Sequence, residues 1–298
     1  MTQRILLLGK AGQLGRALSS ALMQQHEVLA VSKADCDITD GRTLERLMRT
    51  FEPDVVVNAA AYTAVDEAER NRSLAFAVNA DALSTLGELC QRTETILVHY
   101  STDYVFDGVQ SQPYTEADRS NPISVYGKSK WAGEESIRRT CDRHLILRTS
   151  WLFSGYGNNF LKSMLSLMQY DKKISVVNDQ FGAPTSCDLV ASVTADLLAR
   201  LHVGQAANAE FGTYHVTAGG KASWFDYACF IASNASRFGH AIRVTPDQLL
   251  GVSAADYGRL APRPRNSCLS TEKLVRAIGV NMPDWQTDVL RVLEALGK

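Results

Sequence analysis

Short apolar runs alternate with amphipathic segments through the first half of the chain, and this alternation limits the folds open to it. Ile5–Leu8 is apolar throughout and ends at Gly9, as expected of a strand buried on both faces. Leu14, Leu18 and Leu22 recur at helical spacing. Further strand-like runs lie at 28–31, 55–57, 96–98 and 145–147; further helical segments carry Leu44 to Met48, with Asp40 as N-cap, and Leu83 to Leu89. The pattern predicts right-handed βαβ units, and therefore an α/β fold with a Rossmann-type, doubly wound parallel sheet.

The second half of the chain is less regular. Glycine, proline and asparagine gather at 155–159, 178–184 and 262–267, and helices are expected around 160–169, 187–201 and 224–237. No linker-like stretch separates the two halves. We therefore predict a dinucleotide-binding domain over 1–150 and a smaller, mainly substrate-binding lobe over 151–298 that is interleaved with it.

Bulk composition excludes several classes of protein. The formal net charge of -1 over 298 residues gives no basic surface of the kind that nucleic-acid binders use. The six cysteines are scattered, which favours free thiols in a reducing cytoplasm, and the six dispersed histidines predict no catalytic metal. No run approaches the roughly 20 apolar residues that cross a membrane, and the first apolar run is too short for a signal peptide. We expect a cytoplasmic protein without nucleic-acid or membrane partners.

Unusual segments follow four of the expected strands. They are Gly9, Asn58-Ala59-Ala60, Ser101-Thr102-Asp103 and Thr149-Ser150-Trp151. Ligands of open parallel sheets bind outside the carboxyl ends of the strands, so these segments predict one site along one edge of the sheet.

The segment between the first strand and the first helix has glycine at three-residue intervals: Gly9, Gly12 and Gly15. Glycine permits a tight turn and lets the backbone approach a diphosphate, which the N–H groups of the helix N-terminus then bind. Gln13 and Leu14 lie in the same turn. A tight turn that only packs the helix would need similar glycines, but the strand before it and the helix after it favour a dinucleotide site.

The end of the second strand distinguishes NAD from NADP in many such folds, because an acidic residue there binds the ribose hydroxyl and repels a phosphate. Here the strand ends in Val31-Ser32-Lys33, and a hydroxyl with an ammonium group suits a phosphate. This favours NADPH. Asp35 and Asp37 lie close by and Lys33 can equally be a solvated loop residue, so NADH stays open.

Tyr126 and Lys130 carry the predicted chemistry. On a helix they share one face at i and i+4, and an ammonium group near a phenol favours the phenolate and lowers the pKa of the phenol. The phenol could then give a proton to a carbonyl oxygen while hydride reaches the carbon. Thr102 is the expected third member, since its hydroxyl can bond the substrate carbonyl or the phenol; capping of the backbone is its structural alternative.

Together these residues resemble the extended short-chain dehydrogenase/reductase superfamily, and five longer runs narrow the resemblance to the dTDP-4-dehydrorhamnose reductase family. The runs are Val57–Asp66, His99–Phe106, Arg148–Trp151, Asn178–Thr185 and Arg263–Ser267. The resemblance covers nearly the whole chain, from Gly9 to about Leu269.

The resemblance implies reduction of the C4 ketone of dTDP-4-dehydro-L-rhamnose by NAD(P)H. In this pattern Tyr126 is the proton donor, Lys130 lowers its pKa and holds the nicotinamide ribose, and Thr102 binds the carbonyl. The cofactor would lie against Gly12, Gln13 and Leu14 (diphosphate), Asp37 and Ile38 (adenine side), and Ala60, Ala61 and Tyr62 (inner ribose). The sugar would contact Thr102, Asp103 and Trp151.

Three further residues fit the substrate on chemical grounds. The flat indole of Trp151 suits a sugar ring, although core packing would also explain it. Arg263 and Arg265 suit a diphosphate because guanidinium binds phosphate bidentately, although a solvated loop would also hold them. Some relatives carry a glutamate after the glycine loop that supports a magnesium-bridged dimer. Here Arg16-Ala17-Leu18 follows Gly15, so magnesium and a homodimer stay open.

Three other functions are found with, or fit, a fold of this kind, and the motifs argue against only the first. Sugar-nucleotide dehydratases of this fold carry Asp-Glu after the threonine, whereas Asp103 is followed by Tyr104 here, which argues against a dehydratase or epimerase. A non-catalytic regulatory subunit, like that of methionine adenosyltransferase, could keep the same fold. A reductase that delivers hydride to the other face would give a 6-deoxytalose, and no motif reports the face.

Overall fold

The computed structural model describes residues 2–170, 173–202 and 210–297. Its centre is a six-stranded parallel sheet with strand order β10-β5-β4-β3-β1-β2. The strands are β1 (Arg4–Leu8), β2 (Glu27–Val31), β3 (Val55–Asn58), β4 (Ile96–Thr102), β5 (His144–Thr149) and β10 (Gly212–His215). The strand order reverses beside β1, as in a doubly wound sheet, so the predicted fold class is confirmed.

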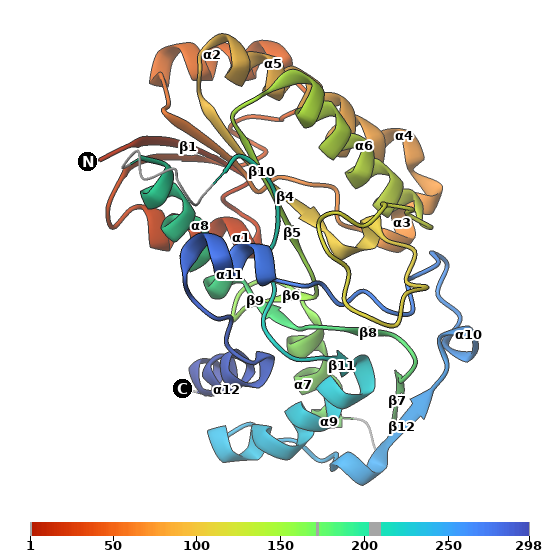
Figure 1. Cartoon of the computed structure of the whole chain (residues 1–298). Helices are drawn as coiled ribbons and strands as arrows, with labels where there is room; N and C mark the ends of the chain where they lie inside the picture. The colour runs from red at the N-terminus through yellow and green to blue at the C-terminus, as the bar shows by residue number, and fades with distance from the viewer. Residues whose placement is uncertain (1, 171–172, 203–209, 298) are drawn as a thin grey trace.

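The sheet lies between two layers of helices (Figure 1), and alternate residues of its strands face one layer or the other. Ile5 and Leu7 point to one face, and Leu6 and Leu8 to the other; all four are fully buried. The first face is covered by α1 (Gln13–Leu22), α8 (Cys187–His202) and α11 (Glu272–Ile278), and the second by α2 (Gly41–Phe51), α5 (Ala82–Arg92) and α6 (Val125–Thr140). Burial on both faces explains why these strands are apolar throughout.

All five strands expected from the first half are present, and so are the expected helices on both sides of the chain midpoint. Asp40 caps α2 as predicted: its carboxylate accepts hydrogen bonds from the backbone of Arg42 and Thr43. The second half supplies α7 (Phe160–Tyr170), α8 and α9 (Trp224–Asn234), close to the expected bounds. The sequence did not indicate β10, a strand from the second half that completes the edge of the sheet beside β5.

The remaining helices of the first half lie between β3 and α5. They are α3 (Val65–Arg70), α4 (Arg72–Phe76) and a π-helical turn at Ala77–Asp81 that leads into α5. A single 3-10 turn, Asp103–Val105, follows β4. These segments border the carboxyl edge of the sheet and supply the walls of the site described below.

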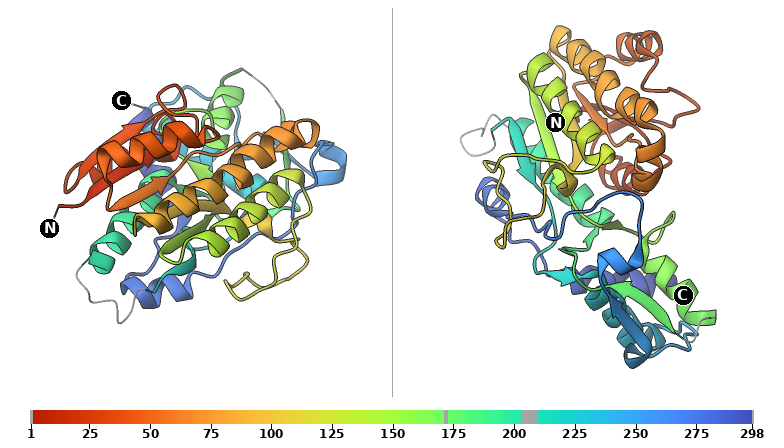
Figure 2. Two further views of the ribbon diagram at one scale, coloured as in Figure 1. Left: turned by 90° about the horizontal axis from the view of Figure 1, so that it is seen from above. Right: turned by 90° about the vertical axis from the view of Figure 1, so that its right-hand side faces the viewer.

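A second hydrophobic core lies below this edge and belongs to residues of the second half (Figures 1 and 2). Helices α7, α9 and α12 (Trp285–Leu296) surround it, together with short strand pairs. The pairs are β6 (Leu152–Phe153) with β9 (Thr185–Ser186), β7 (Ile174–Val177) with β12 (Leu249–Val252), and β8 (Phe181–Gly182) with β11 (Ala222–Ser223). The four-residue helix α10 (Ala254–Tyr257) follows β12. The division at residue 150 stays a prediction, although β10, α8 and α11 show how closely the halves interleave.

Candidate active site

The carboxyl edge of the sheet brings the predicted segments together through strand register. Leu8 lies beside Asn58, Asn58 beside His99, and Thr102 beside Thr149. Residues 41 to 50 positions apart in sequence therefore lie side by side on neighbouring strands. The register is the reason why the glycine loop and the Thr102 turn border the same site.

The glycine loop is packed too tightly for side chains at two of its three glycines. Gly9 has a positive φ of 87°, and a Cβ there would lie 2.7 Å from the backbone nitrogen of Ala60. A Cβ on Gly15 would overlap the carbonyl oxygen of Gly9. Gly12 is different, because a Cβ there would meet only that same oxygen at an ordinary 3.5 Å. Gly12 precedes α1 without a side-chain cap, so the first N–H groups of the helix have no capping side chain.

A groove of about 320 Å³ begins at this loop. Its walls contain eight residues that the sequence assigned to the cofactor: Gly9, Gly12, Lys33, Asp37, Ile38, Ala60, Ala61 and Tyr62. The Leu14 side chain faces the core instead, and Gln13 bonds to the 154–159 loop, where its amide contacts Asn158 and Asn159. Gln13, Leu14 and Gly15 could therefore contact a diphosphate only through their backbone groups.

The end of β2 carries a set of paired charges. The Ser32 hydroxyl donates to the Asp35 carboxylate at 2.7 Å, and this hydrogen bonding, led by the Ser32 backbone N–H, lowers the pKa of Asp35 to about 2. Lys10 lies 3.1 Å from Asp35, and Lys33 lies 3.6 Å from Asp37. Ser32 and Lys33, the two residues that the sequence suggested for a phosphate, are each already engaged with a carboxylate, and so is Lys10, which the sequence did not suggest.

Tyr126 lies in the first turn of α6, which Ser124 caps by accepting the backbone N–H of Gly127 at 3.1 Å. A Cβ on Gly127 would overlap the carbonyl oxygen of Tyr104, so α6 begins in direct contact with the turn after β4. Burial raises the pKa of Tyr126 to about 12, with a smaller opposing effect from a hydrogen bond to Thr102. The phenol is therefore protonated at neutral pH and can donate.

This direction corrects the expectation that Lys130 lowers the pKa of Tyr126. Lys130 is buried, and its Nζ lies 2.7 Å from the Tyr100 carbonyl oxygen and 3.0 Å from His99 Nε2. It is turned toward β4, and burial lowers its own pKa to about 8. In the protein without ligands, loss of hydration outweighs the attraction that the i, i+4 spacing suggested.

Thr102 and Asp103 are buried at the end of β4. The Thr102 hydroxyl donates to Asp103 Oδ1 at 2.9 Å and accepts the backbone N–H of Tyr104 at 3.2 Å. Thr102 therefore caps the 3-10 turn, which was its structural alternative. It also contacts the Tyr126 hydroxyl. Burial raises the pKa of Asp103 to about 7, against the lowering effect of hydrogen bonds from Ser267 and Thr102.

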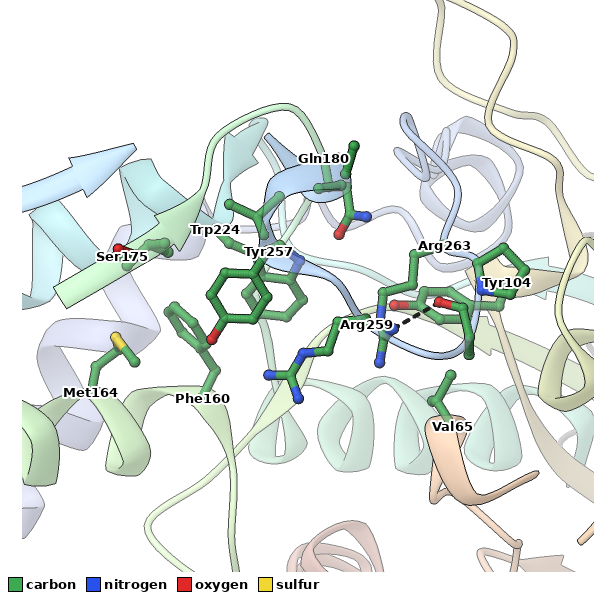
Figure 3. Close-up of a pocket in the computed structure, with 16 residues that line it drawn as sticks. Val65, Tyr104, Phe160, Met164, Ser175, Gln180, Trp224, Tyr257, Arg259 and Arg263 are labelled. Atoms are coloured by element: carbon green, nitrogen blue, oxygen red, sulfur yellow. Dashed lines mark hydrogen bonds between the residues drawn. The ribbon is translucent and has the colours of Figure 1, made fainter. Parts of the chain in front are cut away.

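A second cavity, of about 500 Å³, opens between the sheet edge and the second core (Figure 3). Tyr104, Val65 and Arg263 form one end, Phe160, Met164 and Ser175 the other, and Tyr257 and Arg259 lie between them. Trp224 also lines it. The mixture of aromatic walls and guanidinium groups suits a ligand with a flat ring and negative charge.

Beside Thr102 and Asp103, three further residues were predicted to contact substrate, and they lie in different environments. Arg263 lines the cavity and makes a two-pronged ion pair with Asp66 of α3, at 2.9 and 3.1 Å. Arg265 is exposed and does not line the cavity. Trp151 stacks on Trp224 with 3.5 Å between ring centroids and an angle of 7° between planes, so Trp224 separates it from part of the cavity.

Sequence reasoning missed Trp224, Tyr257 and Arg259. Trp224 opens α9 directly after the capping residue Ser223 and is indistinguishable in sequence from a core aromatic. Tyr257 ends α10, and Arg259 follows two residues later. Their Tyr-x-Arg pattern, four residues before the predicted Arg263, was the only available signal.

Within 2–170, 173–202 and 210–297, no three His, Cys, Asp or Glu side chains are grouped so that they could hold a metal ion. Over the same ranges, no helix combines the length and apolar character that crossing a membrane requires. The six cysteines are unpaired, as expected.

Comparison with known proteins identifies the family. The family model of the RmlD substrate binding domain matches residues 3–297. A dTDP-4-dehydrorhamnose reductase of Salmonella typhimurium is 41% identical over 97% of this chain and 96% of its own length. Crystal structures of dTDP-4-dehydrorhamnose reductases from Bacillus anthracis, in complex with NADP, and Clostridium acetobutylicum are 35% and 34% identical. The Bacillus anthracis structure has a TM-score of 0.86 and covers 98% of this chain and 99% of its own. The Clostridium acetobutylicum structure has a TM-score of 0.89 and covers 99% of this chain and 100% of its own. The chain therefore belongs to the RmlD family, the dTDP-4-dehydrorhamnose reductases of the extended short-chain dehydrogenase/reductase superfamily.

Proposed function

We propose that this protein reduces the C4 ketone of dTDP-4-dehydro-L-rhamnose to give dTDP-L-rhamnose, with NADPH as the preferred reductant. The position of Tyr126 carries the proposal. Its ring packs in one cluster with Tyr62 of the glycine-loop groove, and its centroid lies 5.9 Å from that of Tyr104, which lines the second cavity. A protonated phenol between two ligand-sized cavities can serve a reaction between their occupants.

The groove at the glycine loop suits a nicotinamide dinucleotide. Gly12 leaves room for a diphosphate, and the uncapped start of α1 supplies N–H donors for it. Ala60, Ala61 and Tyr62 would border the inner ribose. When bound, the reduced cofactor supplies the hydride.

Tyr126 would give its proton to the ketone oxygen as the C4 carbon is reduced. The hydroxyl of Thr102, at the end of β4, would hydrogen-bond the same oxygen and orient it. Asp103 would hold Thr102 through their 2.9 Å hydrogen bond. Lys130 is buried next to Tyr126, whereas Tyr126 itself is half-buried and open to a ligand that carries the ketone.

The cavity beside Tyr104 suits the nucleotide portion of the substrate. Arg263 and Arg259 would bind the diphosphate, and the aromatic rings of Phe160, Trp224 and Tyr257 offer flat surfaces for a base or sugar. Trp151 would contact the sugar from the sheet edge. Preference for NADPH is supported by Ser32 and Lys33, which a ribose phosphate would have to draw away from Asp35 and Asp37. We place the reaction in the cytoplasm, where free cysteines stay reduced.

The test is an oxidation assay that follows the absorbance of the reduced nicotinamide, with dTDP-4-dehydro-L-rhamnose as substrate and NADH in parallel with NADPH. We expect faster turnover with NADPH and dTDP-L-rhamnose as the product, identified by chromatography and NMR. A 6-deoxytalose product would keep the reductase and reject the stereochemistry. No oxidation with either cofactor, from folded protein that binds NADPH, would reject the proposed reaction and favour a regulatory role.

A further inference from the structure

The side chain of Gln13, the first residue of α1, reaches across to the loop that leads into α7. Gln13 Oε1 accepts a hydrogen bond from the side-chain amide of Asn159 at 2.8 Å and one from the Ser154 hydroxyl at 3.2 Å. Gln13 Nε2 donates to the carbonyl oxygen of Asn158 at 3.1 Å. Gln13 and Asn159 are 146 positions apart in sequence. The reaction described above gives the Gln13 side chain no part.

Backbone groups at both ends set the direction of this contact. Asn159 directly precedes α7, and its Oδ1 accepts the backbone N–H of Lys162 at 3.1 Å, so Asn159 caps that helix. The NH₂ group of Asn159 is therefore left to donate to Gln13 Oε1. The other end of the Gln13 amide meets the carbonyl oxygen of Asn158, which can only accept, so Nε2 lies there. Reversal of either amide would oppose two donors or two acceptors.

The same loop packs directly on the stem of Gln13. Gly157 has a positive φ of 64°, and a Cβ there would lie 2.8 Å from Gln13 Cγ. One turn later on α1, the Arg16 guanidinium lies 5.5 Å from the centre of the Tyr156 ring. Tyr156, Gly157 and Asn158 are exposed, so little burial holds them in place. The contacts with Gln13 and Arg16 therefore attach this loop to α1.

The two ends of this link belong to the two cavities. Gly12, directly before Gln13, lines the glycine-loop groove, and the N–H groups of this turn are those proposed to bind the cofactor diphosphate. Phe160, directly after Asn159, lines the second cavity together with Met164, one turn further along α7 (Figure 3). A residue of the cofactor groove and a residue of the second cavity are thus joined through two peptide bonds and one hydrogen bond between side chains.

We infer that Gln13 is a positioning residue that couples binding of the cofactor to binding of the nucleotide part of the substrate. A diphosphate at the start of α1 holds the backbone of Gln13 and keeps the loop attached, with Phe160 in place for the nucleotide. A nucleotide packed on Phe160 favours the same attached loop. Because both ligands favour one state, each strengthens binding of the other by the same factor. The inference deepens the proposed function and rests on its assignment of the two cavities.

Equilibrium binding of two probes measures this coupling without turnover. NADP⁺ and dTDP are titrated into the full chain by calorimetry, each alone and each with the other at saturation. Since dTDP lacks the sugar that would meet the nicotinamide, coupling between these probes passes through the protein. We expect the Kd of dTDP to be at least about fivefold lower with NADP⁺ than without it. A ratio close to one in the wild type, with both probes bound, would overturn the inference.

Two substitutions break the link from opposite sides. Gln13→Met keeps the length of an unbranched side chain and removes its polar end, whereas Asn159→Ser keeps a cap for α7 but is too short to reach Gln13. Each should reduce the ratio of Kd values to less than about twofold, and the double variant should lower it no further, because both remove one link. Damage confined to one cavity would weaken its ligand equally with and without the other, and so leave the ratio unchanged. A wild-type ratio in either variant would reject the inference.

The matched control is Gln24→Met, the same chemical change at an exposed residue beyond the other end of α1. It should keep the wild-type ratio, and loss of coupling there would count against a specific role for Gln13. A protein that binds both probes with the expected coupling but does not reduce the keto-sugar would reject the proposed reaction and leave the inference intact. Failure to bind dTDP, with or without NADP⁺, would reject the second cavity as a nucleotide site and the inference with it.

Discussion

At the scale of single residues, burial decides the chemistry more than sequence spacing does. The i, i+4 spacing of Tyr126 and Lys130 places them on one helix and suggests that the ammonium group lowers the pKa of the phenol. In the folded protein both groups lose their hydration, so the pKa of Tyr126 rises to about 12 and that of Lys130 falls to about 8. Both shifts favour the neutral form, which water stabilises least.

Removal of the phenol hydroxyl should test the proposed donor. Tyr126→Phe keeps the ring that packs near Tyr62 and Tyr104, and removes only the proton. We expect kcat to fall by on the order of 10²–10⁴ while the Kd for NADPH stays unchanged. Stopped-flow turnover and fluorescence titration measure the two quantities. Turnover close to wild type would exclude Tyr126 as the donor.

Replacement of Lys130 should trade activity for stability. The pKa of Lys130 is about 8 in the folded protein and 10.5 unfolded, so below pH 8 the fold bears the full cost of a buried ammonium group. Between those values the unfolded chain binds more protons, so wild-type stability rises with pH. Lys130→Met removes this cost, which is up to about 3 kcal/mol of unfolding free energy. It also loses the hydrogen bond to Tyr100, which offsets about 1 kcal/mol of that gain. Urea unfolding should show the variant more stable than wild type near neutral pH, with the advantage fading toward pH 10.5. A constant difference across this range would contradict the depressed pKa.

At the scale of elements, helix packing against the sheet edge depends on glycines whose role is visible only in three dimensions. Gly9, Gly15 and Gly127 each lie where a Cβ would strike backbone atoms of another segment. Gly12 belongs to the same motif, yet has room for a methyl group in the protein alone. The motif in the sequence combines glycines that the fold needs with one that it does not.

A pair of substitutions should separate these roles. Gly12→Ala has a permitted φ of −71° and an ordinary contact, so the free energy of unfolding should change by less than about 1 kcal/mol. NADPH binding should weaken more than about tenfold, because the methyl group enters the space left for the diphosphate. Gly15→Ala should also weaken NADPH binding and, in addition, lower the free energy of unfolding by about 1–3 kcal/mol, since its methyl group overlaps the Gly9 carbonyl oxygen. Thermal unfolding and calorimetry check both. Equal NADPH affinity in Gly12→Ala and wild type would place the diphosphate elsewhere.

At the scale of the whole molecule, the site exists only because the two hydrophobic cores meet along one edge. The second cavity takes Val65 and Tyr104 from the first half of the chain, and Phe160, Trp224 and Arg263 from the second. The ion pair between Asp66 and Arg263 joins segments 197 positions apart. The second cavity is thus a product of tertiary packing.

The two arginines of the Pro-Arg loop offer a matched test of this cavity. Arg263→Ala removes a guanidinium group that lines it, and we expect the KM for the dTDP-sugar to rise about 10- to 100-fold, as for loss of a charge-assisted contact. Arg265→Ala removes an exposed side chain outside it and should change KM less than about threefold. Steady-state kinetics at saturating NADPH measures both. Equal effects would mean that the loop rearranges when substrate binds.

The alternation of strands and helices, the carboxyl edge as the place of a candidate site, and the candidate residues Tyr126, Lys130 and Thr102 could all be predicted from the sequence. These follow from local periodicity, glycine spacing and a family pattern, which are properties of neighbouring positions. Only the tertiary structure decided that β10 joins the sheet, that Trp224, Tyr257 and Arg259 line the cavity, and that Arg265 does not. It alone set the direction of the pKa shifts and placed His99 between Asn58 and Lys130. Burial and contact between distant segments arise from packing of the whole chain, and no local pattern encodes them.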